Sequence, residues 1–356
     1  MFETFGFEET TAKQASVLFA LILGAIFGAL AERTGFCFRR AVVGEDRRSA
    51  AGVWMMALAV AVIGTQGLVS VELISFDEHR FMSSDFPVLA VILGGVMFGI
   101  GMVLTRGCVS RLTVLGGTGN LRALLVLLVF AVVAHAMLKG VLAPLRVALG
   151  SVTIDLGSNV SLATLPGGGW LYAAALAGAA LITALRSGNA PLLLLGAALI
   201  GALVPLGWVG TGYILLDEFD PIALESLSFT SPAADTLFYT IASTSITPGF
   251  GVGLIGGVLA GSLIAALLFG SFRWQSFDSP RQTSRYMAGA VLMGMGGVLA
   301  GGCTLGAGLS GAPTLSVAAI TALLSIALGG KLADQIIRSA SGSDAPSATP
   351  TQQPAE

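Results

Sequence analysis

Charged side chains are scarce in this 356-residue chain. Lysine, arginine, aspartate and glutamate make up 11% of the residues, whereas a typical soluble domain has roughly 25%. Hydrophobic residues make up 54%, and the formal net charge is −2. A soluble fold of this size needs more charge on its surface, and a nucleic-acid-binding protein needs a basic excess. The composition excludes both classes and predicts an all-α polytopic membrane protein.

Cysteine and histidine are scarce as well. The chain has three cysteines, Cys37, Cys108 and Cys303, and two histidines, His79 and His135. These five residues lie far apart, without any pair at metal-ligand spacing, so we expect no metal site and no cofactor. The odd number of cysteines also argues against a complete disulfide framework.

Long charge-poor stretches are abundant. A bilayer core needs roughly 20 apolar residues per helix. The charge-free run from Tyr286 to Gly330 is too long for one helix, and residues 301–313 in its middle contain many helix breakers, so we expect two helices there. The nine predicted spans lie at about 17–31, 50–71, 86–105, 123–138, 170–185, 191–206, 249–270, 286–300 and 314–329.

The basic residues predict the orientation. Alternate connections between the predicted spans hold fourteen of the 18 lysines and arginines, and the opposite side holds four. Basic connections stay in the cytoplasm, so we expect the N-terminus outside and the C-terminus inside a bacterial inner membrane. Residues 1–338 are predicted to form one membrane transport domain, and the polar residues 339–356 a disordered cytoplasmic tail.

An internal repeat divides this domain. The fifteen residues from Gly94 to Cys108 align without gaps with those from Gly289 to Cys303, and eight positions are identical, including the final Gly-Cys pair. Four predicted spans precede the linking span at 170–185 and four follow it, which inverts the second half relative to the first. We therefore predict two inverted repeats, at about 17–140 and 191–330, with a substrate site between them.

Each cysteine follows a glycine-rich predicted helix, and we expect the backbone to break there near the midplane. Irregular backbone at this depth is tolerated only inside protein or beside a wet cavity. A small anion that leaves water needs donors along its route. Neutral S–H groups and backbone N–H groups supply them without holding the ion as tightly as a fixed arginine would. The three thiols therefore predict a path for a soft, sulfur-containing anion.

Four segments carry a more specific pattern. They are residues 24–41, which end in RTGFCFRRA, the run that ends in LTRGC at Cys108, GTGNLRAL at 117–124, and GMGGVLAGGCTLGAGLSG at 294–311. Together they resemble the YeeE/YedE family of sulfur-compound transporters, and the resemblance extends over nearly the whole chain apart from the tail. Thiosulfate uptake is the best-understood activity in that family. The resemblance implies a permease in which cysteines pass thiosulfate along by S–H···S hydrogen bonds.

The resemblance places the three cysteines on the path, and residues within or beside their motifs are further candidates. Arginines beside the first-half motifs either form the positive-inside signal or attract the anion at the inner mouth. Family members often work beside a small TusA-like sulfur-carrier protein, which is the partner expected here besides the anion and the lipid bilayer. The predicted path residues are Cys37, Cys108, Cys303, Gly107, Gly302, Thr304, Arg33, Arg106 and Arg111.

A second hypothesis is a membrane-embedded sulfurtransferase or thiol-redox enzyme that carries sulfur as a cysteine persulfide. Such an enzyme needs an activated thiolate beside a base, and none of the three cysteine motifs contains a histidine. We therefore expect a transporter and not an enzyme. Within transport, the motifs fit thiosulfate, sulfite and selenium compounds alike.

Overall fold

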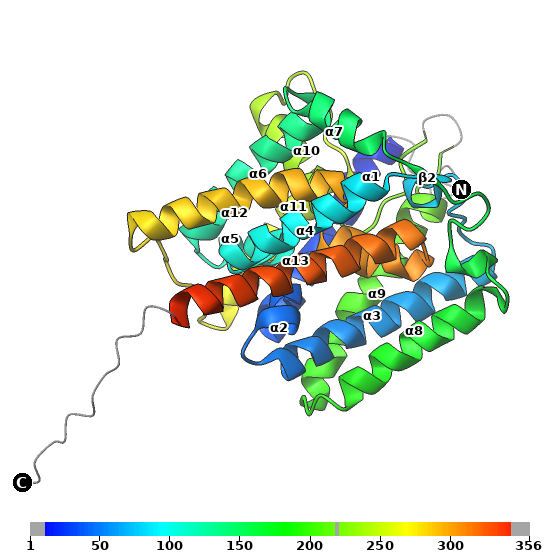
Figure 1. Ribbon diagram of the computed structural model, residues 1–356, viewed down its shortest axis with the longest axis horizontal. Coiled ribbons are helices and arrows are strands. Elements are labelled where there is room, and N and C mark those ends of the chain that lie inside the picture. The colour runs from blue at the N-terminus through cyan, green and yellow to red at the C-terminus, as the bar shows by residue number, and fades with distance from the viewer. Residues whose placement is uncertain (1–10, 218–220, 343–356) are drawn as a thin grey trace, which may run out of the picture.

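The structure is a computed structural model that describes residues 11–217 and 221–342. These residues form a bundle of helices with two short antiparallel strands, β1 (Asp85–Phe86) and β2 (Ile154–Asp155) (Figure 1). Short 3₁₀ turns cover Arg80–Met82, Leu162–Thr164 and Ala312–Thr314, and π-helical turns cover Gly210–Ile214 and Thr304–Gly311. The α-helices are α1 (Ala12–Thr34), α2 (Phe38–Val43), α3 (Arg47–Ser70), α4 (Val88–Leu104), α5 (Val109–Gly117), α6 (Leu121–Lys139), α7 (Ala143–Gly150), α8 (Gly168–Leu185), α9 (Pro191–Val209), α10 (Thr230–Ile241), α11 (Phe250–Leu268), α12 (Pro280–Leu299) and α13 (Val317–Gly342).

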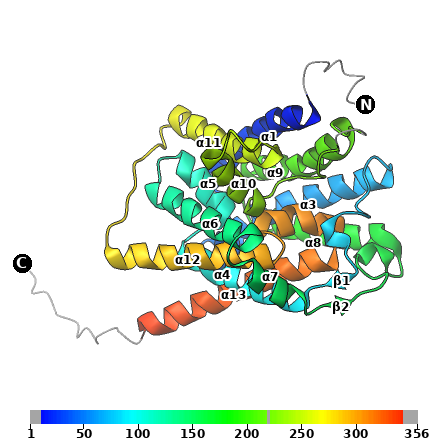
Figure 2. The same cartoon turned by 90° about the horizontal axis from the view of Figure 1, so that it is seen from above.

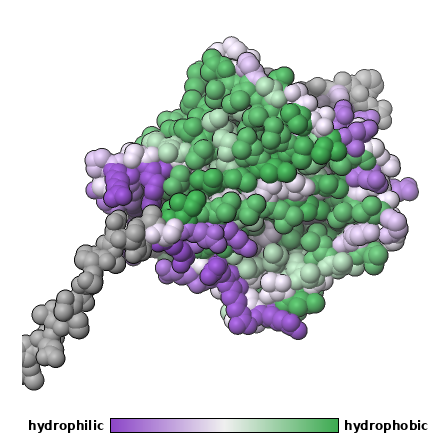
Figure 3. Space-filling model, viewed as in Figure 1, coloured by the Kyte–Doolittle hydropathy of each residue, from purple (hydrophilic) through white to green (hydrophobic). Residues whose placement is uncertain are grey.

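Nine helical segments of the described chain are long and apolar enough to cross a membrane, which confirms the predicted helical class and the number of spans. Apolar residues cover the middle of the face in Figure 3, and hydrophilic residues gather toward its left and right ends. The segments are Ala12–Val43, Arg47–Ser70, Val88–Gly117, Leu121–Lys139, Gly168–Leu185, Pro191–Ile214, Phe250–Leu268, Pro280–Thr314 and Val317–Ser339.

Some elements differ from the sequence-based expectation. Helices α7 and α10 lie in connections where no helix was predicted, and α10 packs against α6 and α11. Helix α13 continues to Gly342, four residues into the predicted tail, and the i,i+4 ion pair Asp334–Arg338 (2.7 Å) stabilises its last turns. The remainder of the predicted tail, 343–356, lies outside the described residues.

Helices α1 and α11 lie side by side at very short range (Figure 2). A methyl group added at Gly24 of α1 would overlap the carbonyl of Leu254, and one added at Gly257 of α11 would overlap the carbonyl of Leu21. Glycine at these positions lets the two backbones touch, as in other small-residue helix interfaces of membrane proteins. The glycines on this interface are therefore structural.

The first and second halves of the bundle are interleaved. Helix α3 packs against α9, and α4 packs against both α12 and α13, while α6 also contacts α12. Cys108 and Cys303 both belong to the large buried core that these helices share. The core is therefore built between the halves, and the cysteines lie inside it.

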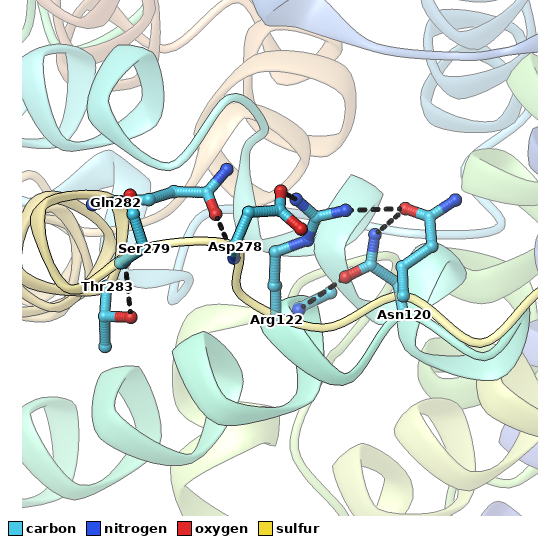
Figure 4. A network of polar contacts seen from close by, with 8 residues as sticks. Asn120, Arg122, Asp278, Ser279, Gln282 and Thr283 are labelled. Atoms are coloured by element: carbon cyan, nitrogen blue, oxygen red, sulfur yellow. Dashed lines mark hydrogen bonds and ion pairs between the residues drawn. The ribbon is translucent and has the colours of Figure 1, made fainter.

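A polar network joins the link between α5 and α6 to the connection between α11 and α12 (Figure 4). The Asn120 Nδ2 donates a hydrogen bond to Gln275 Oε1 at 2.8 Å, and the Arg122 Nη2 donates one to the same oxygen at 3.2 Å. Arg122 also pairs with Asp278 at 3.3 Å. These contacts fix the start of α6 against the second half of the chain.

Candidate functional site

The three cysteines share one backbone arrangement. In each case a helix ends in a left-handed residue, one residue follows, and the cysteine then adopts an extended conformation and begins the next helical segment. The left-handed residues, each two positions before its cysteine, are Gly35 (φ +62°), Arg106 (φ +60°) and Gly301 (φ +73°). The same backbone conformation therefore recurs before all three cysteines.

Hydrogen bonds of the helix ends explain this arrangement. The N–H of Phe36 donates to the Ala31 carbonyl at 3.2 Å, and the N–H of Gly107 donates to the Met102 carbonyl at 3.1 Å. These are the bonds that close a helix over a left-handed residue. Glycine adopts that conformation without strain, whereas Arg106 adopts it at a cost of roughly 1–2 kcal/mol. The chain therefore turns sharply just before each thiol.

Cys37 and Cys108 lie next to each other although they belong to different spans. Both are free thiols with almost no exposed surface, and their side chains interact with each other. The Sγ of Cys108 is 3.1 Å from the Ser110 hydroxyl. On its other side it faces the hydroxyl of Thr304, which is buried and has no hydrogen-bond partner of regular geometry among the described residues. This unpartnered hydroxyl is a donor available to a ligand.

Cys303 lies beyond Cys108 on the second-half side of the site. It is completely buried and interacts electrostatically with Cys108. The N–H of Gly306 donates to its Sγ at 3.4 Å, and the N–H of Phe229 also faces the sulfur. The three thiols therefore form a sequence from Cys303 through Cys108 to Cys37.

A cavity of about 790 Å³ lies on the Cys303 side of this sequence. Its lining includes the connection between α3 and α4, the segment that precedes α10, and the π-helical turn that Cys303 begins. Gly306 and Ser310 of that turn form part of the wall, and Arg80 of the α3–α4 connection interacts electrostatically with Cys303. The cavity therefore lies beside the π-helical turn that Cys303 begins, while the fully buried Cys303 is not one of its lining residues.

Two arginines lie on the Cys37 side. Arg111 donates to the Ala31 carbonyl at 3.1 Å and interacts electrostatically with Cys37 and Cys108. Arg40 donates to the Gly35 carbonyl at 2.8 Å and forms an ion pair with Asp46. Positive charge therefore stands beside the last thiol.

The other predicted arginines point elsewhere. The guanidinium of Arg33 stacks on the Phe269 ring, 3.9 Å from its centroid, and its side chain is exposed. Arg106 is exposed at the end of α4. Neither makes a described contact with a cysteine, and an anion-attracting role for either one stays a prediction.

The two predicted path glycines differ in the space around them. A methyl group at Gly302 would lie 2.9 Å from the backbone nitrogen of Ala307, so this position needs glycine. The nearest atoms to a methyl group at Gly107 belong to Leu112 at 3.5 Å, an ordinary contact. Gly302 therefore permits the turn into the π-helical segment, while Gly107 would tolerate alanine.

Sequence reasoning assigned no path role to Arg40, Arg80 or Glu225. Arg80 is one of only four lysines and arginines in the connections predicted to lie outside the cell. Glu225 is one of five acidic residues in the 208–247 connection, which is predicted to lie on the same side. Their rarity could have marked them as candidates, because only 11% of the residues in this chain are charged.

Comparison with known proteins finds relatives that match most of this chain. The thiosulfate transporter TsuA of Escherichia coli (strain K12) is 27% identical over 323 residues, which cover 82% of this chain and 86% of that protein. The thiosulfate transporter TsuA of Spirochaeta thermophila is 25% identical over 332 residues, which cover 87% of this chain and 95% of that protein. A family model described as sulphur transport matches residues 33–332, a range that includes all three cysteines. The chain therefore belongs to the sulphur transport family.

Proposed function

We propose that this protein imports thiosulfate, or a closely related sulfur anion, into the cytoplasm. The observation that carries the proposal is the order of groups through the core. The turn that Cys303 begins lines a cavity, Cys303 interacts electrostatically with Cys108, and Cys108 interacts with Cys37, beside which Arg111 lies. The two relatives named as thiosulfate transporters favour thiosulfate as the cargo.

The proposed mechanism is a relay of neutral thiols. Each S–H group donates a hydrogen bond to the anion and releases it to the next thiol, while the hydroxyl of Thr304, which faces Cys108, adds a donor near the middle of the route. A thiolate would repel the anion, and burial favours the neutral thiol. Donors without a formal charge also let the ion leave, because no single step holds it strongly.

Symmetric contacts support the inverted repeat. The proposed alignment relates Gly94 to Gly289 and Gly101 to Gly296. A methyl group at Gly101 would meet the carbonyl of Gly289 at 2.6 Å, and one at Gly296 would meet the carbonyl of Gly94 at 2.6 Å. Exchanging the two halves converts the first contact into the second. A two-fold relation between the halves requires this.

The helix pairs follow the same relation. Under the repeat, α1 and α3 correspond to α9 and α11, so the α1–α11 pair corresponds to the α9–α3 pair, and both pairs pack closely. Likewise, the α4–α13 pair corresponds to the α12–α6 pair, and both are present. We place the cysteine breaks near the midplane, since each cysteine lies within a candidate span and not at its end.

The orientation follows from charge. We propose that the cavity opens to the outside and that Arg40 and Arg111 face the cytoplasm of a bacterial cell, across its inner membrane. A TusA-like sulfur-carrier protein, if it serves this chain as it serves relatives, would then meet the anion on the Cys37 side.

Uptake of ³⁵S-thiosulfate into proteoliposomes tests the proposal. We expect uptake by the wild type, and a loss of about five- to hundredfold in Cys108→Ala and in Cys303→Ala, because each variant removes a donor worth about 1–3 kcal/mol beside a desolvated ion. Protein-free liposomes give the background, and size-exclusion profiles establish that both variants fold. Normal uptake by both variants would rule out the relay, and no uptake by the wild type would rule out thiosulfate as cargo.

A further inference from the structure

Two segments that lie far apart in the sequence both line the cavity. The 3₁₀ turn Arg80–Met82 is fixed by Ser316, whose hydroxyl donates to the Phe81 carbonyl at 2.7 Å. The segment that carries Glu225 is fixed by Thr211, whose Oγ1 accepts from the Glu225 N–H at 3.0 Å, and by Ser310, whose hydroxyl donates to the Leu227 carbonyl at 2.7 Å. Arg80 and Glu225 are therefore held in place by their backbones.

These two side chains carry opposite charges and line the same cavity without forming an ion pair among the described residues. Both line it and interact electrostatically, yet no ion pair within 4.0 Å joins them in the described part of the chain. The described contact of the Arg80 guanidinium is the Phe81 ring, 5.2 Å away. A guanidinium has five N–H donors in a planar fork that suits an oxyanion. Arg80 therefore lines the cavity within electrostatic range of Cys303, and its guanidinium donates no hydrogen bond to any residue that the structure describes.

We propose that this cavity is an outer anion-binding site in which Arg80 binds the anion and Glu225, when ionised, competes with the anion for Arg80. The inference rests on the proposed function for the identity of the anion. Proton uptake by Glu225 would remove the competing charge and open the site, so binding would depend on external pH while the thiol path itself stays unchanged.

The surroundings of Glu225 place its ionisation near neutral pH. Burial and the charge of Asp235 raise the pKa of Glu225 to about 7, against the opposing effect of Arg80. Burial lowers the pKa of His79 on the facing wall to about 4, so His79 is neutral above about pH 5. Asp77 and Glu78 also face the cavity and are exposed at its rim. Glu225 is thus the half-buried group in the cavity whose charge changes as the external pH passes through 7.

The expected sign and size follow from this pKa. Below pH 7 Glu225 is mostly neutral and the anion binds; above pH 7 it is mostly ionised and the apparent affinity falls. If only the neutral form binds, the apparent Kd rises about tenfold between pH 6 and pH 8, since the competent fraction falls by that factor. Thiosulfate and sulfate remain dianions throughout this range, so the change belongs to the protein.

Equilibrium binding of ³⁵S-thiosulfate to the purified full-length protein in detergent tests the inference. We expect the tenfold change in the wild type, and tight binding at both pH values in Glu225→Gln. Glu78→Gln is the matched control, since it removes the same charge at the rim and should keep the pH dependence. Arg80→Gln should lose most binding at pH 6, and Arg80→Lys should recover part of it, which separates loss of charge from misfolding.

The outcomes distinguish this site from the transport function. Normal thiosulfate uptake together with an unchanged pH dependence in Glu225→Gln would overturn the binding site and leave the transporter. If the protein neither takes up nor binds thiosulfate, ³⁵S-sulfate is the second probe. Sulfate binding with a pH dependence that Glu225→Gln abolishes would support the site while the proposed cargo fails, and pH-independent sulfate binding in the wild type would overturn the site.

Discussion

At the scale of single residues, Cys37 is the position that separates a hydrogen-bond donor from a covalent carrier. A weaker sequence similarity relates Phe27–Phe36 to Ile200–Trp208 with one gap, and the next residue is Cys37 in the first half and Val209 in the second. The repeat therefore does not require a thiol here. Cys37 is also the last thiol of the proposed relay, between Cys108 and the inner arginines.

We therefore predict that Cys37→Ser retains more uptake than Cys37→Ala. Serine keeps a donor of similar size, whereas alanine leaves the ion without one, at a cost of about 1–3 kcal/mol or about five- to hundredfold in rate. The measurement is initial ³⁵S-thiosulfate uptake, together with intact-mass spectrometry of the wild type after exposure to substrate. Two equally inactive variants and a persulfide adduct that forms and turns over would instead indicate a sulfur-transferring enzyme.

At this scale the sequence indicated the helix starts at the cysteines but not the arrangement of the charges around them. A glycine-rich helix followed by Gly-Cys is a local pattern, and each cysteine does begin a new helical segment. The arrangement of Arg80 opposite Glu225 depends on how two connections from different halves fold together, and no local pattern encodes that. The difference between Arg111, which lies beside the thiols, and Arg33, which stacks on Phe269, likewise depends on tertiary packing.

At the scale of elements, the α1–α11 interface depends on glycines that allow backbone contact. We predict that Gly257→Ala lowers the free energy of unfolding by about 1–3 kcal/mol, because the added methyl group would overlap the Leu21 carbonyl and lie 3.0 Å from the Ala25 nitrogen. The neighbouring Gly256 has no atom within 4 Å of an added methyl group. Gly256→Ala is therefore the control, and it should be neutral or stabilising by up to about 1 kcal/mol.

Thermal unfolding in detergent measures both variants. A Gly257→Ala protein as stable as Gly256→Ala would show that the two helices separate easily, contrary to the packing described. Uptake by Gly257→Ala need not change if the variant still folds, because this interface lies outside the thiol path.

Helices that form long apolar runs were predictable from the sequence. Helical segments that depend on tertiary contacts were not. Hydropathy located all nine spans, yet α10 was not predicted because its segment, TSPAADTLFYTI, mixes apolar and polar residues and contains a proline. Packing against α6 and α11 stabilises it as a helix. Likewise, the π-helical turn from Thr304 to Gly311 is a geometry that helix breakers alone do not specify.

At the scale of the whole molecule, the orientation in the membrane is the main prediction. We expect a membrane-impermeant thiol reagent applied from outside to label a cysteine introduced at Ser245, which is exposed in the connection between α10 and α11, but not one introduced at Arg281, which is exposed at the start of α12. The native cysteines are buried and should give a low background. Labelling of both positions from the same side would contradict the nine-span topology.

The interleaved packing of the two halves also has a consequence for how the chain is made. Helix α1 leaves the ribosome first, but the helix that covers its glycine face, α11, belongs to the last third of the sequence. Until α11 is inserted, the early helices have no native partner for these surfaces and face lipid or each other. Contacts between residues so distant in sequence form slowly and leave partly assembled states exposed. The bundle therefore closes only when synthesis is nearly complete, and shortened chains that stop before α11 should be targets for membrane proteases.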